Sequence, residues 1–326
     1  MSLLKHVFPK GNKSKELETE SAVVEPRTYG LQEARENYFC YLYPKETSAP
    51  LSVPQKLVVD VVKNSLSKRS ARDKAVPRLP MVIPKLLRSL RDPDSCARDY
   101  VKIINKDPVM SAAVLKLANS AYFNPTGTRI NDIEPAVIKL GIEGLRSVLS
   151  AAVMQPIIQK DSPYFSQSGQ RMWHHSLCCA VACEIIAEHR RQERFKYYLM
   201  GLVHDIGNIT IFSELCRQFK MNGENQKPGY NAFVPLMKVL SPAVSFWVAK
   251  DWELPKEVCK ALAEQVNIQA KNKISVYGHV LYQANLVAEI YACHQHEKQR
   301  LPRRVLSDLK LPLNMYQKLE QLSIEV

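Results

Sequence analysis

The sequence predicts an all-α protein that forms one compact array of about a dozen helices. Apolar residues recur with helical spacing in nearly every segment from Leu79 to residue 292. The alternation of apolar and polar residues that is typical of half-buried strands is sustained nowhere. Asp92-Pro93 and Asp107-Pro108 add helix start signals, since each combines an N-cap aspartate with a proline at the first helical position.

The first 78 residues precede this array. Residues 1–26 are polar and of mixed charge, so we expect a mobile segment there. Residues 27–78 are interpreted as a helical extension that packs on the main domain. This extension holds the stretch LVVDVVKNSLSK (57–68), whose spacing predicts an amphipathic helix. It also holds an aromatic cluster, made of Tyr29, Tyr38, Phe39, Tyr41 and Tyr43.

Capping residues mark the helices in the first half of the array. The helix that starts at Asp107-Pro108 ends near Asn119 and Ser120, which are placed to bond the backbone at that end. Asn131-Asp132 precede the next helix as its N-terminal cap. That helix ends at Gly141, which fits the C′ position, and a further helix follows it.

The second half contains long apolar segments of helical period. They are RMWHHSLCCAVACEIIAEHRR (171–191), YYLMGLVHDIGNITIFSEL (197–215), VPLMKVLSPAVSFWVAKDW (234–252), PKEVCKALAEQV (255–266) and ISVYGHVLYQANLVAEIYACHQ (274–295). We interpret the segment at 197–215 as one helix or a helix pair. Residues 293–326 are interpreted as a C-terminal region with one short helix and a tail.

The composition predicts a cytoplasmic globular protein. Hydrophobic residues make up 46% of the 326 residues, which is enough for a core. No uninterrupted apolar run reaches the roughly 18–20 residues that cross a bilayer, and the N-terminal stretch lacks a signal-peptide core. None of the eight cysteines forms a Cys-x-x-Cys pair, so we expect free thiols rather than a zinc ribbon or a redox site.

The net charge of +13 favours an acidic partner. Nucleic acid, an acidic protein face and a phosphorylated ligand would each satisfy this charge. The basic residues are scattered among acidic ones, however, and the sequence has no arginine-rich arm or RNA-binding aromatic motif. The charge is therefore compatible with nucleic-acid binding but does not favour it.

One constellation has the residue types of a metal site: His175 in one predicted helix and His204-Asp205 in the next. Imidazoles and carboxylates that converge from rigid helices bind divalent metals, which lower the pKa of bound water. The pair lies in an apolar stretch, LMGLVHDIGNITIF (199–212), where unpaired polar groups are costly. Two explanations of the His204-Asp205 pair remain open: a functional site, or two buried groups that satisfy each other's hydrogen bonds.

The ordered motifs around this pair resemble those of a known family. HHS (174–176) followed by YYLMGLVHDIGNI (197–209) is similar to the HD phosphohydrolase superfamily. Upstream, DPVMSAAVLKLANSAYFN (107–124) and I-x-x-I-x-x-AVIKLG (130–141) narrow the resemblance to the HDOD family, the HD-related output domains of bacteria. It implies an HDOD domain over residues 79–292, with an HD-domain-like C-terminal half and an additional N-terminal helical half.

The resemblance also implies that catalysis is lost. Active HD enzymes supply an aspartate from a later helix, where this chain has Asn285, and an amide brings no negative charge to a metal. Further departures from the residues of active relatives lie at Asn208, Ser241 and Glu264-Gln265. We therefore predict no catalytic residue and a vestigial ligand pocket, made of His175, His204, Asp205 and Asn285. A cofactor is not expected, although the first three residues suit a single divalent ion (Fe, Mn, Zn or Mg).

Three functions remain open on these grounds. The first is a non-catalytic signal-transduction module that acts through protein or small-ligand binding, on a kinase, a diguanylate cyclase or another regulator supplied in trans. The second is a metal-dependent phosphohydrolase that acts on a nucleotide or a cyclic dinucleotide. The third is a nucleotide or nucleic-acid sensor that works without turnover.

Overall fold

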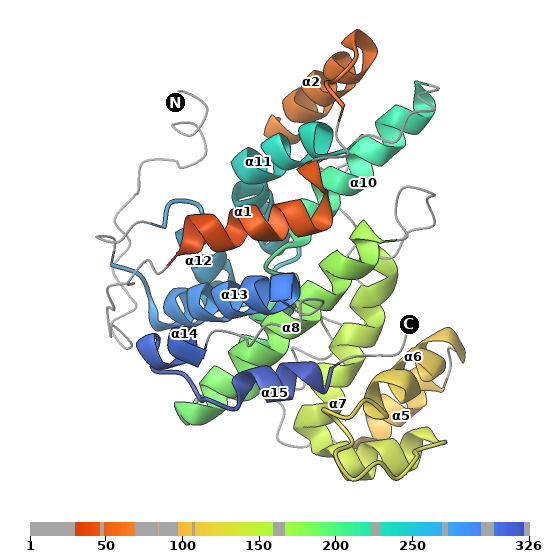
Figure 1. Cartoon of the computed structure of the whole chain (residues 1–326). Coiled ribbons are helices and arrows are strands. Elements are labelled where there is room, and N and C mark those ends of the chain that lie inside the picture. The colour runs from red at the N-terminus through yellow and green to blue at the C-terminus, as the bar shows by residue number, and fades with distance from the viewer. Residues whose placement is uncertain are drawn as a thin grey trace, which may run out of the picture.

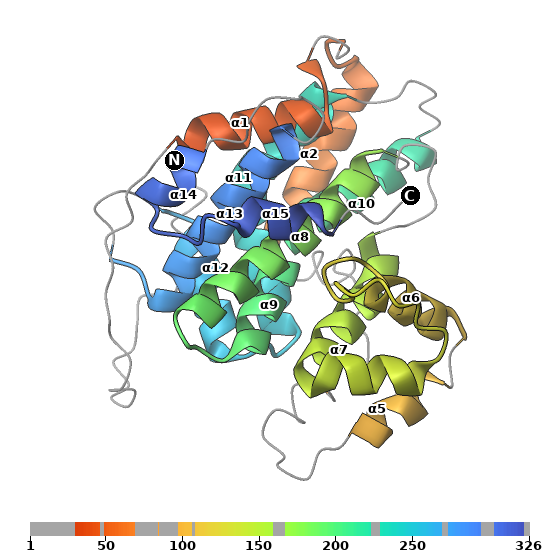
Figure 2. The same ribbon diagram turned by 60° about the horizontal axis from the view of Figure 1, so that its bottom comes forward.

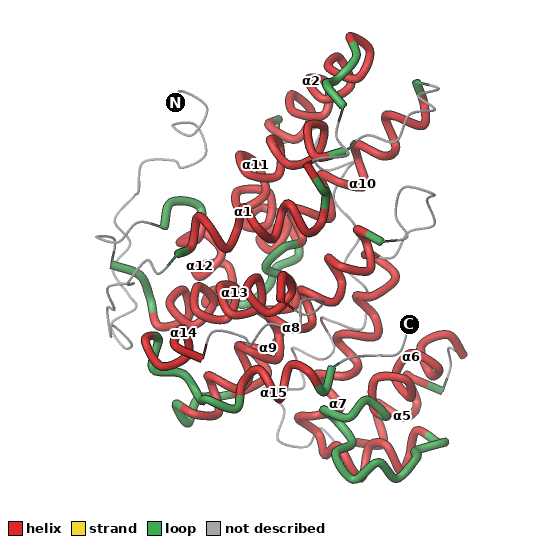
Figure 3. The backbone as a smooth tube through the Cα atoms, viewed as in Figure 1, coloured by secondary structure: helices red, strands yellow, loops and turns green. Residues whose placement is uncertain are grey.

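The computed structural model describes residues 30–45, 49–68, 84, 97–105, 108–158, 167–222, 229–268, 273–294 and 303–322. These residues form helices and no strand, which confirms the all-α prediction (Figure 3). The helices are α1 (Leu31–Leu42), α2 (Val53–Ser67), α5 (Ala97–Ile104), α6 (Pro108–Ala118), α7 (Ile133–Ile158), α8 (Ser168–His189), α9 (Arg194–Val203), α10 (Ile206–Met221), α11 (Tyr230–Asp251), α12 (Lys256–Gln265), α13 (Val276–His294), α14 (Arg303–Asp308) and α15 (Met315–Glu320).

Helix α8 forms the centre of the core. Nearly every side chain from Met172 to Ala187 is buried, because the apolar residues continue around all faces of the helix. Helices α9 and α13 pack along α8, and α7 and α15 also contact it. In Figure 1, α8 passes between α13 on one side and α7 on the other. The buried thiols of Cys178, Cys179 and Cys183 are free, as the sequence predicts.

Helices α5, α6 and α7 form the additional N-terminal half, which lies beside the C-terminal helices in Figure 2. Helix α6 begins at Pro108, as predicted. Asn119 closes its end, since the Asn119 side-chain amide donates to the carbonyls of Leu115 and Ile130 at 2.9 and 2.7 Å. Gly141 has a φ of 64° and interrupts α7 at the predicted position.

The N-terminal extension lies across the C-terminal half. Helix α1 packs on α13, and α2 packs on α10 and α11. Tyr38, Phe39 and Tyr43 of the aromatic cluster are buried in this contact. The predicted mobile segment 1–26 lies outside the described residues, and so does most of the chain between α2 and α5.

The prediction of one short helix after residue 293 is wrong. The chain forms two helices, α14 and α15, on either side of Leu311-Pro312. Packing against the core stabilises both helices, because Leu306, Met315 and Leu319 are fully buried there. A helix of six residues is too short to give a clear helical period in the sequence.

Helix α11 is long and apolar enough to cross a membrane by length and composition. No uninterrupted apolar run in the sequence indicates such a span. Within the structure 56% of its most apolar window is buried, and α11 packs against α10, α12 and α2. The core helix of a globular fold passes the same test, so α11 is weak evidence for a membrane span.

The crossing of α8 and α9 depends on Gly201. A Cβ at this position would lie 2.6 Å from the carbonyl oxygen of Cys179 and 2.7 Å from the Cα atom of Ala180. Only glycine allows two backbones to approach this closely. The crossing fixes the end of α9 and therefore the position of His204-Asp205, which follow it.

Gly201→Ala should destabilise the protein by about 1–3 kcal/mol, because backbone atoms of α8 must move to accept the new methyl group. Urea denaturation of the full chain measures this change in the free energy of unfolding. Gly144→Ala is the matched control, because its Cβ would meet only the Leu140 side chain, at 3.2 Å. Equal unfolding free energies for Gly201→Ala and wild type would contradict the close crossing.

Candidate functional site

The four side chains of the predicted pocket converge. His175 lies midway along α8 and is fully buried. His204 and Asp205 lie between α9 and α10, and Asn285 lies on α13. His175, His204 and Asp205 form the one group in the described part of the chain whose side chains could hold a metal ion, with their ligand atoms within 4.8 Å of one another.

The motif at 197–215 forms a helix pair, and its break falls on the site. His204 is the C-cap of α9, and Asp205 is the N-cap of α10. On a single helix, the other arrangement that the sequence allowed, adjacent side chains would point about 100° apart. At the break the two side chains instead approach the same point, and Gly207 helps to hold α10 there by donating its N–H to Ser245 Oγ at 2.9 Å.

The polar atoms of the site lie close together. His175 Nε2 is 3.2 Å from His204 Nε2 and 3.1 Å from Asn285 Oδ1. His204 Nε2 is 2.9 Å from Asn285 Oδ1. The Asp205 carboxylate lies 3.5 Å from His175 Nε2 and 3.6 Å from His204 Nε2. We name these four residues the His-Asp cluster.

The His-Asp cluster contains more hydrogen-bond acceptors than donors. His204 Nδ1 donates to the carbonyl oxygen of Gly201 at 2.7 Å, so in the neutral ring Nε2 presents a lone pair. Asn285 Oδ1 and the Asp205 carboxylate are also acceptors. The Nε2 hydrogen of His175 satisfies one of them at a time. An excess of buried acceptors favours a positive charge close by.

One divalent ion fits this arrangement. Ligand atoms about 2.0–2.2 Å from a metal lie roughly 3 Å or more from one another, and one ligand atom from each of His175, His204 and Asp205 lies within 4.8 Å of the other two. A histidine whose other nitrogen donates to a backbone carbonyl is the usual arrangement around a bound metal, and His204 has it. His175, His204 and Asp205 would hold the ion, which would lower the pKa of a bound water. A two-metal centre does not fit, because the cluster has a single carboxylate.

The charges of the cluster follow from burial and from nearby ionic groups. Burial lowers the pKa of His175 to about 3, so this ring is neutral. Burial also acts to raise the pKa of Asp205, but His204, His175 and Arg35 outweigh it, and the pKa of Asp205 is lowered. Asp205 is therefore a carboxylate at neutral pH.

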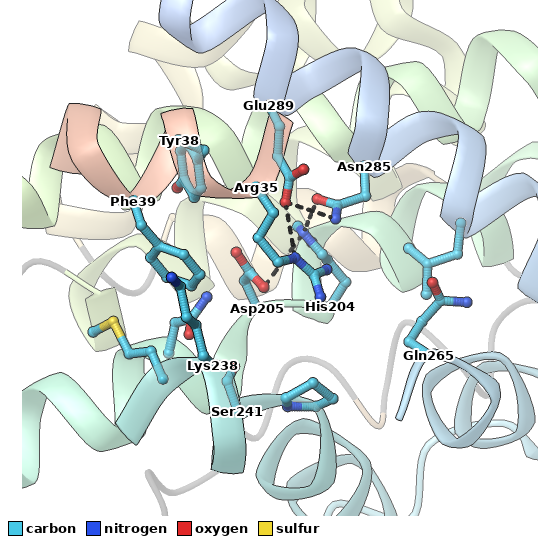
Figure 4. A pocket seen from close by; sticks show the side chains of 14 residues that line it. Arg35, Tyr38, Phe39, His204, Asp205, Lys238, Ser241, Gln265, Asn285 and Glu289 are labelled. Carbon is cyan, nitrogen blue, oxygen red and sulfur yellow. Dashed lines mark hydrogen bonds and ion pairs between the residues drawn. The ribbon is translucent and has the colours of Figure 1, made fainter. Parts of the chain in front are cut away.

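Two charged residues that the sequence motifs did not indicate lie next to the cluster. Glu289 is one turn after Asn285 on α13, and its Oε1 accepts from Asn285 Nδ2 at 3.1 Å. Arg35 extends from α1 and donates from Nε to the same oxygen at 3.4 Å (Figure 4). Burial raises the pKa of Glu289 to about 7, although Arg35 opposes the shift. The sequence could have indicated Glu289, because it is an acidic residue within the apolar stretch that forms α13. No local pattern indicated Arg35.

Helix α1 covers the cluster and is anchored at several points. The Tyr38 ring lies over His175, with ring centroids 4.3 Å apart. Glu36 accepts hydrogen bonds from Lys238 and Tyr230 of α11, which together with Lys45 lower the pKa of Glu36 to about 2. Beneath α1 remains a cavity of about 40 Å³, with space for a few water molecules.

Some of the other positions named from the sequence line this cavity, and the rest lie outside it. Asn208, Ser241 and Gln265 line the cavity. Glu264 does not, because its carboxylate accepts hydrogen bonds from the backbone and hydroxyl of Ser275. His174 lies outside the His-Asp cluster and stacks near Tyr291 on α13.

Comparison with known proteins places these motifs in one family. The family model of the HDOD domain matches residues 76–268. An HDOD domain protein of unknown function from Geobacter sulfurreducens has a similar structure, with a TM-score of 0.54 at 21% identity, over 82% of this chain and 89% of that chain. A protein of Shewanella amazonensis SB2B, whose name proposes a metal-dependent phosphohydrolase, has a TM-score of 0.56 at 20% identity, over 84% of this chain and all of that chain. At these identities the likeness shows the fold alone. No curated protein matches the chain significantly.

Asn285→Asp should raise the affinity for Mn²⁺ at least about tenfold, because it gives the cluster a second carboxylate ligand. Isothermal titration calorimetry of the full chain measures this. Gln265→Glu is the matched control, since Gln265 lines the cavity but its side-chain amide donates to the carbonyl oxygens of Ala261 and Gly278 rather than to the cluster. If both variants bind Mn²⁺ as the wild type does, the cluster is not a cation site.

The stability of the protein should depend on the ionisation of Glu289. Its pKa rises from 4.5 to about 7 on folding, so the folded state holds this proton more tightly and loses stability as the pH rises through that window. The free energy of unfolding of the wild type should fall by about 3 kcal/mol from pH 5 to pH 8, relative to that of Glu289→Gln over the same range. Urea denaturation at both pH values measures the difference. If the difference in unfolding free energy between the wild type and Glu289→Gln is the same at both pH values, the raised pKa of Glu289 is contradicted.

Proposed function

The chain belongs to the HDOD family, and from that premise we propose that it is a non-catalytic regulatory module of bacterial signal transduction. The observation that carries this proposal is the position of α1, which lies across the His-Asp cluster with Arg35 beside Asp205 and Glu289. Helix α1 forms one wall of the cavity that a substrate would have to enter, through Arg35, Tyr38 and Phe39. The module would act by binding other molecules rather than by turnover.

The size of the cavity supports this proposal. The cavity of about 40 Å³ beside α1 has room for a few water molecules. A nucleotide does not enter a space of this size unless α1 moves away. Helix α1 is held by the Glu36 contacts with α11 and by Arg171, whose guanidinium donates to the Tyr41 carbonyl oxygen at 2.5 Å and lies over the Tyr41 ring.

The ligand set supports it as well. Hydrolysis of a phosphate ester at a metal centre requires bound metal ions. Carboxylate ligands hold these ions in place and balance their positive charge. Asn285 supplies a neutral oxygen where a carboxylate would supply charge, and Glu289 is turned toward Arg35 and Asn285. We propose that the pocket of His175, His204, Asp205 and Asn285 is retained for structure and at most for a single ion.

Partners would then be regulatory proteins supplied in trans, such as a kinase or a diguanylate cyclase. The net charge of +13 favours an acidic face on such a partner. Nucleic acid is a lesser candidate, and the salt dependence of binding separates the two, because phosphate contacts give a steep loss of affinity with salt.

A second candidate function is metal-dependent phosphohydrolysis. The convergence of donor atoms and the His204–Gly201 hydrogen bond favour it. It requires that α1 move, so a variant that weakens the docking of α1 gives the fairest test. Arg35→Ala removes the contact with Glu289 while leaving the His-Asp cluster in place.

The test is an assay of the full chain and of Arg35→Ala against a panel of nucleotides and cyclic dinucleotides, with Mn²⁺, Mg²⁺ or Fe²⁺. We expect no product from either protein beyond the level that His204→Ala gives. Elemental analysis of the purified protein accompanies the assay and shows whether an ion is bound. Metal-dependent product release that His204→Ala abolishes would replace the proposed function with the hydrolase.

A further inference from the structure

Helix α2 has two apolar faces. The inner face packs on the body of the protein and buries Val62 and Leu66 completely or nearly so. The outer face carries three large apolar side chains that remain in solvent. Val53 is 71% exposed, Leu57 is 62% exposed and Val61 is 52% exposed. We name these three residues the α2 stripe.

The α2 stripe is a continuous feature. Its residues are spaced by four, so they follow one side of the helix over two turns. Other large apolar side chains that are exposed in the described part of the chain lie singly on different elements: Val109, Ile138, Met221, Val239 and Leu313. Single exposed apolar residues are ordinary, whereas a row of them indicates a contact surface.

The stripe is presented on a firmly held helix at the edge of the molecule. Ser52 and Gln55 form a capping box at the start of α2, which fixes its first turn. The inner face anchors α2 on α10 and α11. In Figures 1 and 2, α2 lies at the periphery with one side turned away from the other helices.

The charges beside the stripe indicate what it contacts. Lys56 and Asp60 are exposed, lie one turn apart and border the same side of the stripe. Neither takes part in an ion pair within the described residues. When a second α2 lies antiparallel about a two-fold axis at Leu57, Leu57 meets its own copy and Val53 meets Val61 of the second copy. Lys56 then lies opposite Asp60 of the second copy, and the reverse pair forms by symmetry.

We propose that the α2 stripe is the surface through which two copies of this chain associate, with their α2 helices antiparallel. In a parallel two-fold pair the charged flanks of the two copies would lie on opposite sides of the contact and Lys56 would not meet Asp60, so the charge pairs favour the antiparallel arrangement. The contact is smaller than the roughly 1,200 Å² of a standard interface, so the dimer is expected to be weak and concentration-dependent. The inference is independent of whether the His-Asp cluster binds a metal.

The test is sedimentation equilibrium of the full chain over about a hundredfold range of concentration. The wild type should convert from monomer to dimer within it. Leu57→Lys should weaken association at least about tenfold, because it places a charge at the centre of the apolar contact. Val109→Lys is the matched control, because Val109 is 73% exposed on α6, away from the stripe, and should leave association unchanged. Circular dichroism checks that each variant is folded.

A charge exchange tests the proposed orientation. Lys56→Glu and Asp60→Lys should each weaken the dimer, because each places like charges opposite one another. The double variant restores both pairs in reverse and should recover the wild-type association. A wild type that stays monomeric throughout, or a Leu57→Lys variant that associates as the wild type does, would overturn the proposal. Single and double charge variants that behave alike would overturn the antiparallel arrangement.

Discussion

The contact between Arg35 and Glu289 is the interaction on which this account depends. The His-Asp cluster gathers buried acceptors and one carboxylate in the core, and such a group requires positive charge or protons nearby. Arg35 brings a permanent positive charge beside the cluster, and Glu289 meets it from α13 at 3.4 Å. The same contact ties α1 to α13 beside the site and adds to the anchors that Glu36 and Arg171 provide, so it links the charge of the pocket to the docking of α1.

The N-terminal extension therefore has two faces with different tasks. Helix α1 faces inward and lines the cavity beside the His-Asp cluster, while α2 carries the α2 stripe on its outer face. Both pack on α11, and Lys238 of that helix bonds Glu36 of α1. The extension lies outside residues 76–268, to which the family model applies. Arg35 and the other α1 residues that line the cavity thus belong to a segment that the family model does not describe.

Local signals in the sequence predicted most of the fold. These signals act over a few residues: the proline at the start of α6, Gly141 within α7 and the long apolar period of α8. Each prediction made from them is confirmed. The convergence of the predicted pocket followed from the resemblance to a family. Arg35 could not be found in this way, because it meets Glu289 across 254 residues of sequence. One short helix was predicted where α14 and α15 form, because tertiary packing rather than local pattern holds them.

A double-mutant cycle between Arg35 and Glu289 tests the central claim most directly. The free energies of unfolding of the wild type, Arg35→Ala, Glu289→Gln and the double variant give the coupling between the two side chains. Because the pKa of Glu289 is about 7, the cycle is measured at pH 8.5, where Glu289 is ionised, and at pH 5.5, where it is protonated. The account predicts a coupling of about 1–3 kcal/mol at the higher pH that falls at the lower pH. A coupling near zero at both would show that Arg35 does not fix α1 over the site.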